Sequence, residues 1–340
     1  MSSVSHVATR PDGYAPLTPQ CVMDALEGVG LYGDGRLLQL NSYENRVFQV
    51  HLEDGRVVVA KFYRPGRWSD AQILEEHAFA LELDNDEVPV AAPLCLPISG
   101  DTLAHATFDG VDYRFCVTER RAGRAPELDN PQTLEWLGRF IGRLHATSKR
   151  HRFEYRRTLN VETFGHQPRA ALLNGNFIPD EQRGSWQSAA DAALARVAVA
   201  FNACPTVGWL RLHGDCHTGN ILWRDNEGPH FVDLDDACSG PAIQDLWMLL
   251  SGDSASMEQQ LAVVLTGYHS FMDFDRRELT LIEPLRTLRM IHHSAWLAER
   301  WSDPAFPKAF PWFGTTSYWA EQASQLLEQC AAMDEPPPQP

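Results

Sequence analysis

Residues 210–247 read LRLHGDCHTGNILWRDNEGPHFVDLDDACSGPAIQDLW, the densest run of polar and potential metal-binding side chains in the chain. Within it, the tripeptide HGD at 213–215 is followed by Asn220, and an apolar pair precedes Asp233. A single Asp or Asn in a loop usually forms a turn or caps a helix. Three oxygen-bearing side chains at these offsets, between apolar segments, are poorly explained by chance, so we expect the active site here.

The apolar pieces of this stretch predict two short strands, at 220–223 and 230–232, joined by a turn at 226–229. Such a hairpin places Asn220 and Asp233 beside each other at its open end. Phosphoryl transfer needs hard oxygen ligands for Mg²⁺ and one carboxylate that orients the attacking hydroxyl. We therefore predict that Asp215 is the catalytic carboxylate and that Asn220 and Asp233 are Mg²⁺ ligands. Asp233 is also predicted to be a catalytic residue.

The motif HGDxxxxN at 213–220, with DxD at 233–235, resembles the catalytic segment of the aminoglycoside phosphotransferase and choline kinase family, relatives of the eukaryotic protein kinases. The segments NSYENRVFQV (41–50) and KFYRPGRW (61–68) extend this resemblance over nearly the whole chain. The resemblance implies an α+β, bilobal protein-kinase-like fold, with a small β-rich N-terminal lobe and a larger, mainly helical C-terminal lobe. It also implies that ATP and Mg²⁺ lie between the lobes.

The acceptor of the phosphate is left open by the catalytic residues, which serve any hydroxyl. A narrower resemblance, to bacterial serine/threonine protein kinases of a stress response, implies transfer of the γ-phosphate to Ser/Thr hydroxyls of proteins. The wider family phosphorylates small molecules, namely choline, homoserine, sugars or aminoglycosides, and this is the alternative. A third hypothesis, a nucleotide-binding scaffold without turnover, is disfavoured by the complete set of site residues.

The nucleotide-binding part is predicted from residues 37–64, which read as three strands with a hairpin turn at Asp54-Gly55. The loop at 41–45 lies where kinases cover the phosphates, but it lacks their glycines. In the resembled family a polar loop with serine covers the nucleotide, so Ser42 is expected to contact ATP, with a plain hairpin turn as the alternative. Lys61 ends a strand similar to the kinase VAIK segment and would neutralise the α and β phosphates.

A lysine at the end of a strand means little without a carboxylate partner on the following helix. Residues 69–83 have a capping serine and apolar positions at helical spacing. Glu76 is the preferred partner of Lys61, because the family pattern places such a glutamate before Leu81 and Leu83. Glu75 is the alternative, and whichever of the two is not the partner is expected to face water.

The domain boundary is predicted at 119–126, which is rich in charge, Gly and Pro. We expect an N-terminal lobe at 1–120 with a loose leader at 1–16, a catalytic lobe at 121–333 and a disordered tail at 334–340. A second strand pair is predicted with Asp109-Gly110 as the turn before a strand at 113–118. Residues 301–313 are expected to form a loop packed on the larger lobe, with a peptide-binding platform as the less favoured alternative. By resemblance, Asp245 opens a helix and braces the catalytic loop. Further helices are expected at 19–28, 185–203, 256–272, 277–300 with a kink or restart at Pro284, and 318–333. Another helix is expected from Asn130, a good N-cap before proline, with apolar positions recurring as far as Leu144.

The composition excludes several classes of function. Lys and Arg number 29 against 45 Asp and Glu, a net charge of −16, which disfavours binding to nucleic acid or to an anionic membrane surface. No stretch approaches the roughly 20 apolar residues that span a bilayer. The seven cysteines are scattered and lack CxxC spacing, which indicates reduced thiols. Cys216 and Cys238, which flank the site, are expected to be small apolar fillers, with oxidisable thiols as the alternative. We therefore expect a cytoplasmic monomer.

Overall fold

The computed structural model describes residues 13–205 and 208–340. Most of the predicted loose leader lies outside the described residues. Two compact units make up the described chain. The first comprises the residues up to Leu74 together with Pro93–Arg120 and Glu299–Pro311, and the second comprises Glu75–Ala92, Arg121–Ala298 and Trp312–Pro340. Each unit therefore combines segments that are far apart in the sequence.

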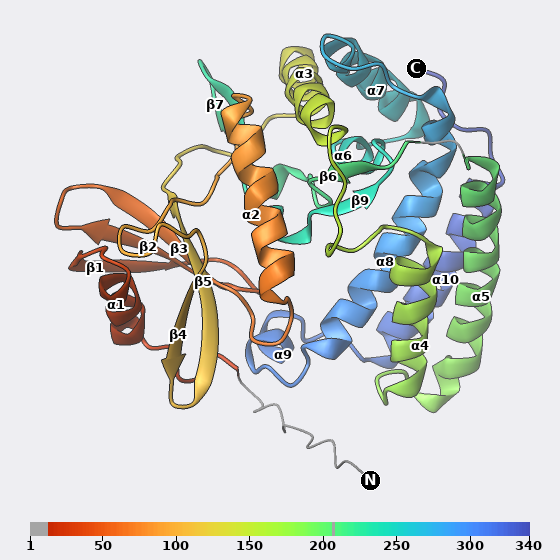
Figure 1. Cartoon of the computed structure of the whole chain (residues 1–340). Helices are drawn as coiled ribbons and strands as arrows, with labels where there is room; N and C mark the ends of the chain where they lie inside the picture. Colours follow the sequence, from red (N-terminus) through yellow and green to blue (C-terminus); the bar gives the residue numbers. More distant parts are fainter. Residues whose placement is uncertain (1–12, 206–207) are drawn as a thin grey trace. The chain divides into compact units, whose positions relative to one another are not determined.

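The first unit contains a five-stranded antiparallel sheet with strand order β1-β2-β3-β5-β4 (Figure 1). Its strands are β1 (Gly33–Leu40), β2 (Arg46–Leu52), β3 (Val57–Phe62), β4 (Ala104–Phe108) and β5 (Val111–Glu119). Successive side chains of a strand point to opposite faces. In β3, Val58, Ala60 and Phe62 are therefore buried in the core, while Lys61 lies on the other face. The predicted strands and both predicted hairpin turns are confirmed.

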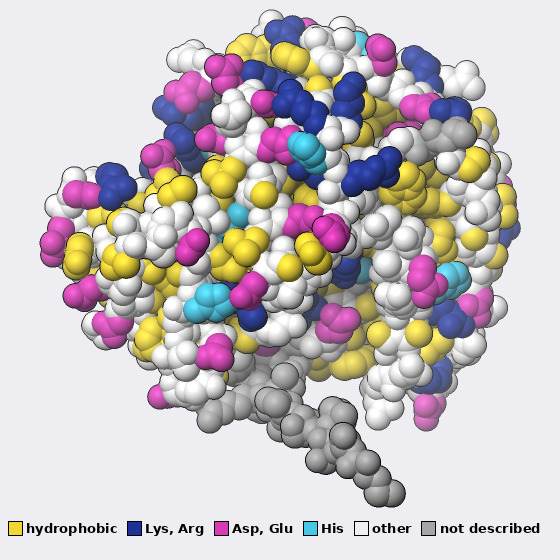
Figure 2. Space-filling model, viewed as in Figure 1, with side chains coloured by type: hydrophobic (Ala, Val, Ile, Leu, Met, Phe, Trp, Pro, Cys, Tyr) yellow, Lys and Arg dark blue, Asp and Glu magenta, His cyan; other side chains and the backbone are white. Residues whose placement is uncertain are grey.

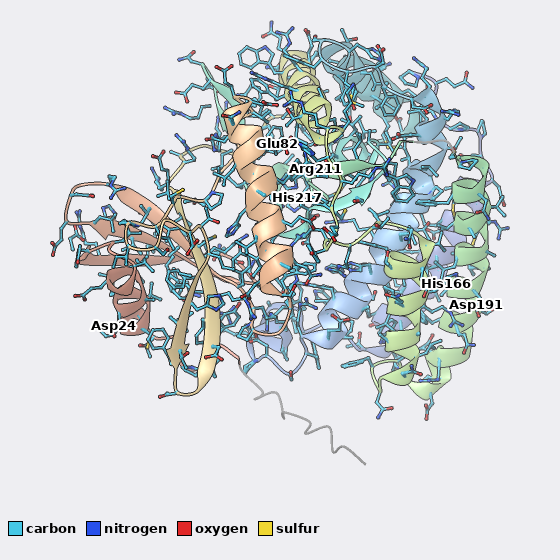
Figure 3. All side chains as sticks on the ribbon, viewed as in Figure 1. Asp24, Glu82, His166, Asp191, Arg211 and His217 are labelled. Atoms are coloured by element: carbon cyan, nitrogen blue, oxygen red, sulfur yellow. The ribbon has the colours of Figure 1, made fainter. Side chains whose placement is uncertain are left out.

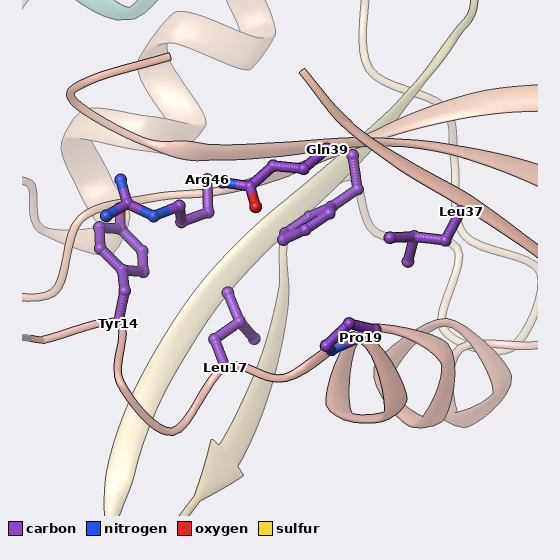
Figure 4. A pocket seen from close by; sticks show the side chains of 7 residues that line it. Tyr14, Leu17, Pro19, Leu37, Gln39 and Arg46 are labelled. Atoms are coloured by element: carbon purple, nitrogen blue, oxygen red, sulfur yellow. The ribbon is translucent and has the colours of Figure 1, made fainter. Parts of the chain in front are cut away.

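Helix α1 (Pro19–Gly28) packs on this sheet (Figure 1). It begins where predicted, because Thr18 caps it by accepting the backbone N–H of Cys21 and proline fits its first turn. A pocket of about 300 Å³ lies beside the helix (Figure 4). The guanidinium of Arg46 lies 4.3 Å above the Tyr14 ring at one side of this pocket.

Residues 301–313 correct one prediction. They are not a loop on the larger unit: they contain α9 (Ala305–Ala309), and residues up to Pro311 belong to the first unit. The cause is electrostatic, because Arg300 and Asp303 are both buried and buried charges need partners. Arg300 Nε lies 2.5 Å from Glu44 Oε2, and Arg64 Nη2 lies 3.0 Å from Asp303 Oδ2.

Helix α2 (Asp70–Asn85) contributes to both units, since the division falls after Leu74. The helix begins as predicted, with the Ser69 hydroxyl accepting the backbone N–H of Gln72. In the first unit, Ile73 is buried in a small cluster with Tyr63, Trp68, Leu103 and Cys116. In the second unit, Glu82 of this helix lies 2.6 Å from Arg211 (Figure 3).

The second unit is mainly helical (Figure 1). Two pairs of helices, α3 with α7 and α5 with α10, pack side by side. Gly138 of α3 allows a close approach, since a Cβ there would lie 1.9 Å from the Val264 carbonyl oxygen. The helices are α3 (Pro131–Ser148), α4 (Gln167–Asn174), α5 (Asp180–Ala203), α6 (Gln244–Trp247), α7 (Ser254–Tyr268), α8 (Ile282–Glu299) and α10 (Thr316–Met333).

The predicted long helices of this unit are confirmed, with ends shifted by a few residues. Pro284 marks a restart, because a 3₁₀ helix at Arg276–Leu281 precedes it and α8 takes it into its first turn. Residues 151–183, for which the sequence predicts no element, contain a π-helix at Glu162–His166 that continues into α4. Residues 336–340 have no regular secondary structure, and their disorder stays a prediction.

Four short strands complete the second unit as two antiparallel pairs, β6 with β9 and β7 with β8. They are β6 (Leu210–Leu212), β7 (Ile221–Arg224), β8 (Gly228–Phe231) and β9 (Cys238–Gly240). Within residues 13–205 and 208–340, none of the helices has the length and apolarity that crossing a bilayer demands. On the face shown in Figure 2, Lys and Arg side chains lie among Asp and Glu side chains.

Candidate active site

The predicted hairpin is present in the second unit. Ile221 pairs with Phe231 and Arg224 with Gly228, so the turn lies at 225–227 and not at 226–229. Beyond the last ladder pair, the backbone N–H of Val232 donates to the Asn220 carbonyl oxygen at 3.0 Å. Asn220 and the residue before Asp233 are therefore hydrogen-bonded neighbours, as the sequence predicts.

Asp215 and Asn220 are also brought together. The Asn220 amide nitrogen donates to the Asp215 carbonyl oxygen at 3.0 Å and to Asp215 Oδ2 at 3.3 Å. These bonds use the nitrogen side of the carboxamide and turn its oxygen away from Asp215. Asp233 has an exposed side chain and a left-handed backbone with φ 60° and ψ 64°, a conformation that aspartate tolerates better than most residues.

His213 connects the catalytic loop to the segment that carries Asp233. Its Nε2 lies 2.9 Å from the Val232 carbonyl oxygen, so Nε2–H is the donor. Its Nδ1 accepts the backbone N–H of Asp215 at 3.4 Å. One neutral imidazole thus fixes the backbone on both sides of the predicted site.

Gly214 shows why the tripeptide has glycine in the middle. Its φ is +85°, a region that disfavours side chains, and a Cβ there would lie 2.2 Å from the Asp236 carbonyl oxygen. The chain after Asp233 therefore passes directly against the catalytic loop. A larger residue at 214 would push the two segments apart.

Asp245 holds the catalytic loop by hydrogen bonds to its backbone. Its Oδ2 accepts the backbone N–H of His213 at 2.8 Å and its Oδ1 accepts that of Gly214 at 2.9 Å. Oδ2 also lies 3.1 Å from Nε2 of His145, whose Nδ1 lies 2.9 Å from the Tyr268 hydroxyl. The bracing role predicted for Asp245 is confirmed, although the carboxylate caps the catalytic loop and not its own helix.

The Asp215 carboxylate lies in a cationic setting. Its Oδ1 is 2.6 Å from Arg289 Nη1, and its Oδ2 is 3.3 Å from His217 Nε2. Burial raises the pKa of Asp215, but the hydrogen bond with His217 and the charge of Arg289 lower it by more, so this pKa lies well below its usual range. Asp215 is therefore ionised at neutral pH.

Glu76 is buried in the second unit, and its Oε2 lies 3.7 Å from Arg156 Nη1. Arg156 also donates through Nε to the Ala237 carbonyl oxygen at 2.9 Å and through Nη2 to the Asp235 carbonyl oxygen. Arg156 thus connects Glu76 to the backbone that follows Asp233. Lys61 belongs to the first unit, and its pairing with Glu76 stays a prediction.

Glu75 corrects another expectation, because it does not simply face water. Its carboxylate accepts the backbone N–H groups of Glu154, Tyr155 and Arg156 at 2.5, 2.9 and 2.7 Å. Three converging N–H donors stabilise an ionised carboxylate. Glu75 therefore fixes the loop that carries Arg156.

Two residues of the first unit are predicted to contact the nucleotide: Lys61 lies on β3, and Ser42 lies in the loop between β1 and β2. Lys61 pairs in register with Val47 of β2, and its Nζ lies 4.5 Å from the centroid of the Tyr63 ring. Ser42 lies in the loop between β1 and β2, where its hydroxyl accepts the backbone N–H of Asn45 at 3.3 Å. This bond orders the polar loop and uses one lone pair of the hydroxyl.

The residues that would hold Mg²⁺ fit the ion chemically. The amide oxygen of Asn220, which takes no part in the bonds to Asp215, and the exposed carboxylate of Asp233 are hard oxygen donors, few enough to leave coordination places for water and phosphate. Among the described residues, no group of three or more His, Cys, Asp or Glu side chains could hold a metal ion.

Four residues of the site were not predicted from the sequence. His145 lies on the apolar face of helix α3. A polar residue among apolar ones on that face was its only mark in the sequence. Arg156 lies in a segment without periodicity. His217 is two residues from Asp215 and was a visible neighbour, whereas Arg289 lies 74 residues further along the chain, without any local signal.

The sequence profile of the phosphotransferase enzyme family matches residues 36–282, which include all the site residues predicted from the sequence, from Ser42 to Asp233. The chain belongs to this family, and it is therefore a phosphotransferase with a kinase-like fold, as predicted.

Among its relatives, stress response kinase A of Escherichia coli strain K12 is 47% identical over 324 residues, covering 95% of this chain and 96% of the relative. The serine/threonine protein kinase RdoA of Salmonella typhimurium is 47% identical over 325 residues, with the same coverage of both chains. The predicted resemblance to bacterial stress response kinases is confirmed.

Solved structures show the same fold at low sequence identity. An amicoumacin kinase, solved with AMP-PNP, Ca²⁺ and its ligand, has a TM-score of 0.69 at 21% identity and covers 95% of both chains. A microcompartment-associated aminopropanol kinase has a TM-score of 0.68 at 18% identity, with coverage of 92% of this chain and 96% of the other.

Proposed function

We propose that this phosphotransferase moves the γ-phosphate of ATP to Ser or Thr hydroxyls of proteins, with Mg²⁺, in a bacterial stress response in the cytoplasm. One observation supports it most: Asn220 is hydrogen-bonded both to the carboxylate of Asp215 and to the backbone beside Asp233. This is the arrangement that a hydroxyl-orienting carboxylate and two metal ligands require. The 47% identity to a relative named as a serine/threonine protein kinase supports the protein acceptor.

In the proposed reaction, Asp215 accepts a hydrogen bond from the acceptor hydroxyl and aligns its oxygen with the γ-phosphorus. The bond from that oxygen to phosphorus forms while the bond to the β–γ bridging oxygen breaks, and ADP leaves. Because the pKa of Asp215 is low, it takes the proton late, when the acceptor oxygen has lost most of its electron density to phosphorus. Asp215 is thus mainly an orienting group.

The other predicted residues serve the phosphates. Asn220 and Asp233 would hold Mg²⁺, which when bound neutralises charge on the phosphate oxygens. Lys61 would contact the α and β phosphates, and the ordered loop at 41–45 would cover them through the Ser42 hydroxyl and backbone N–H groups. The seven free thiols are consistent with a reducing compartment.

A small hydroxyl-bearing molecule is the second candidate acceptor. The structural neighbours named for amicoumacin and aminopropanol favour it, since they share the fold. Their identities of 21% and 18% are far below that of the kinases named above, so we place the protein acceptor first.

The experiment incubates the purified protein with γ-labelled Mg·ATP and a bacterial lysate, and then separates protein from metabolites. We expect label in protein as phosphoserine or phosphothreonine, and Asp215→Asn should reduce the rate by about 10²- to 10⁴-fold. Asp225→Asn is the matched control, because Asp225 is exposed in the hairpin turn and pairs only with Arg124 among the described residues. Label confined to metabolites would establish the small-molecule alternative, and nucleotide binding without any transfer would establish a scaffold.

A further inference from the structure

An arginine lies against the Asp215 carboxylate, in a chain whose net charge is −16. Arg289 and His217 contact the two carboxylate oxygens, and Arg289 lies on α8. The next turns of α8 carry His292, His293 and Trp296 at offsets of three, four and seven residues from Arg289. Side chains at these offsets share one face of a helix, so the face beside Asp215 combines the cation of Arg289 with aromatic rings. Burial and the charge of Arg289 lower the pKa of His293, so this histidine adds a ring and not a charge.

The guanidinium of Arg289 has more N–H donors than its contacts with Asp215 and Met248 use. Among the described residues its guanidinium contacts Asp215 Oδ1 at 2.6 Å and the Met248 sulfur at 3.8 Å, and its side chain is 42% exposed. A guanidinium has five N–H donors in a planar fork that matches a carboxylate or a phosphate. The donors that do not face Asp215 are therefore directed to solvent.

The oxygen that Arg289 contacts is also the less crowded one for an acceptor. Among the described residues, Oδ2 of Asp215 accepts from Asn220 and faces His217, whereas Oδ1 has one partner, Arg289, and keeps a lone pair for an acceptor hydroxyl. A hydroxyl bound there lies within reach of the arginine. A charged group next to that hydroxyl then interacts electrostatically with the positive charge of Arg289.

The aromatic residues extend this surface along α8. The His293 ring stacks on Trp296 with centroids 5.6 Å apart, and the His292 ring stacks on Phe164 at 4.6 Å. The guanidinium of Arg157 lies 5.7 Å from the Phe164 centroid. Flat rings and a second cation suit an extended chain that carries its own acidic groups better than a compact cation.

We propose that Arg289 is a specificity-determining residue that binds an acidic side chain of a peptide acceptor, close to the Ser or Thr that receives the phosphate. This inference rests on the proposed function, since it takes Asp215 as the residue that aligns the hydroxyl. A polycationic acceptor, such as an aminoglycoside, is disfavoured at the same place because like charges repel. An acidic residue beside the hydroxyl replaces that repulsion with a charge-assisted, bidentate hydrogen bond.

The test uses peptide libraries with a central Ser and one neighbouring position fixed as Asp, Asn or Lys, all other positions being degenerate. Initial rates with labelled Mg·ATP give kcat and KM for each library. Wild type should prefer Asp over Asn by on the order of tenfold or more, mainly through KM, with Lys the poorest. Arg289→Met should remove this preference, Arg289→Lys should retain part of it, and the KM for ATP should stay unchanged in both variants.

Arg286→Met is the matched control, because Arg286 lies one turn earlier on α8 and pairs with Glu283. It should keep the preference for Asp. Equal rates on the Asp and Asn libraries, or a preference that survives in Arg289→Met, would overturn this inference alone. No transfer to any library, together with label in small molecules from the lysate, would overturn the protein-acceptor proposal and this inference with it.

Discussion

Asp245 Oδ2 lies 2.8 Å from the backbone nitrogen of His213, and both residues are buried. The carboxylate therefore satisfies N–H groups of the catalytic loop that have no strand partner. His145 in turn donates a hydrogen bond from Nε2–H to this carboxylate, and its Nδ1 accepts a hydrogen bond from the Tyr268 hydroxyl. The position of the HGD tripeptide thus depends on helices α3 and α7 as well as on its own hairpin.

Asp245→Asn tests this dependence. An amide has one oxygen where the carboxylate accepts three hydrogen bonds, so at least one buried N–H loses its partner. We expect the free energy of unfolding to fall by about 1–3 kcal/mol, and kcat to fall with little change in the KM for ATP. Urea unfolding and initial rates measure both. Asp253→Ala, which removes the cap of α7, should cost about 1 kcal/mol yet leave kcat unchanged, and a parallel loss of kcat there would refute the positioning role.

Gly214→Ala separates backbone strain from close approach. Alanine must adopt φ +85° and also place a Cβ 2.2 Å from the Asp236 carbonyl oxygen. Gly55→Ala is the control, because Gly55 has the same φ of +85° with no atom within 4 Å of its Cβ position. We expect about 1 kcal/mol of destabilisation at 55, and a larger loss with inactivation at 214. Similar thermal shifts in the two variants would show that the contact with residue 236 has no cost.

Glu278 should make stability depend on pH. Burial raises its pKa to about 8, although the backbone N–H of Ile243 opposes this shift. The folded protein therefore holds a proton that the unfolded chain releases above about pH 4.3, and stability should fall as pH rises from there to about 8. The free energy of unfolding measured from pH 5 to 9 should show this fall in wild type and a smaller one in Glu278→Gln. A variant curve with the wild-type slope would contradict the assignment.

The two cysteines beside the site should resist thiol reagents. Cys216 and Cys238 are 1% and 2% exposed, and burial, reinforced by the charge of Asp245, raises the pKa of each thiol. Iodoacetamide at pH 8 should label the exposed Cys95 first, with activity retained. Mass spectrometry of the labelled folded protein checks this order, and early modification of Cys216 would disprove it.

The sequence predicted what local patterns encode. The hairpin at 220–233, the helix at 19–28 and the N-cap of α3 at Asn130 follow from turn residues and periodicity within a few positions. The domain boundary expected at 119–126 from a change in composition stays a prediction, and residues 75–92 and 299–311 each belong with a distant part of the chain. Such assignments depend on tertiary partners that no local window contains.

The parts of the site that were not predicted are long-range ion pairs and hydrogen bonds. Arg289 reaches Asp215 from 74 positions away, and Arg156 lies 80 positions from Glu76. Each is an arginine in a chain that has many, and only burial or proximity to a carboxylate distinguishes it. The choice between Glu75 and Glu76 illustrates the same limit, since both proved to have partners inside the second unit.

The contact between Glu44 and Arg300 spans 256 positions. It supports the loop of Ser42 from a segment that a ribosome adds 256 residues after Glu44. The loop proposed to cover the nucleotide is therefore completed late in translation, and a nascent chain cut short before residue 300 lacks this anchor.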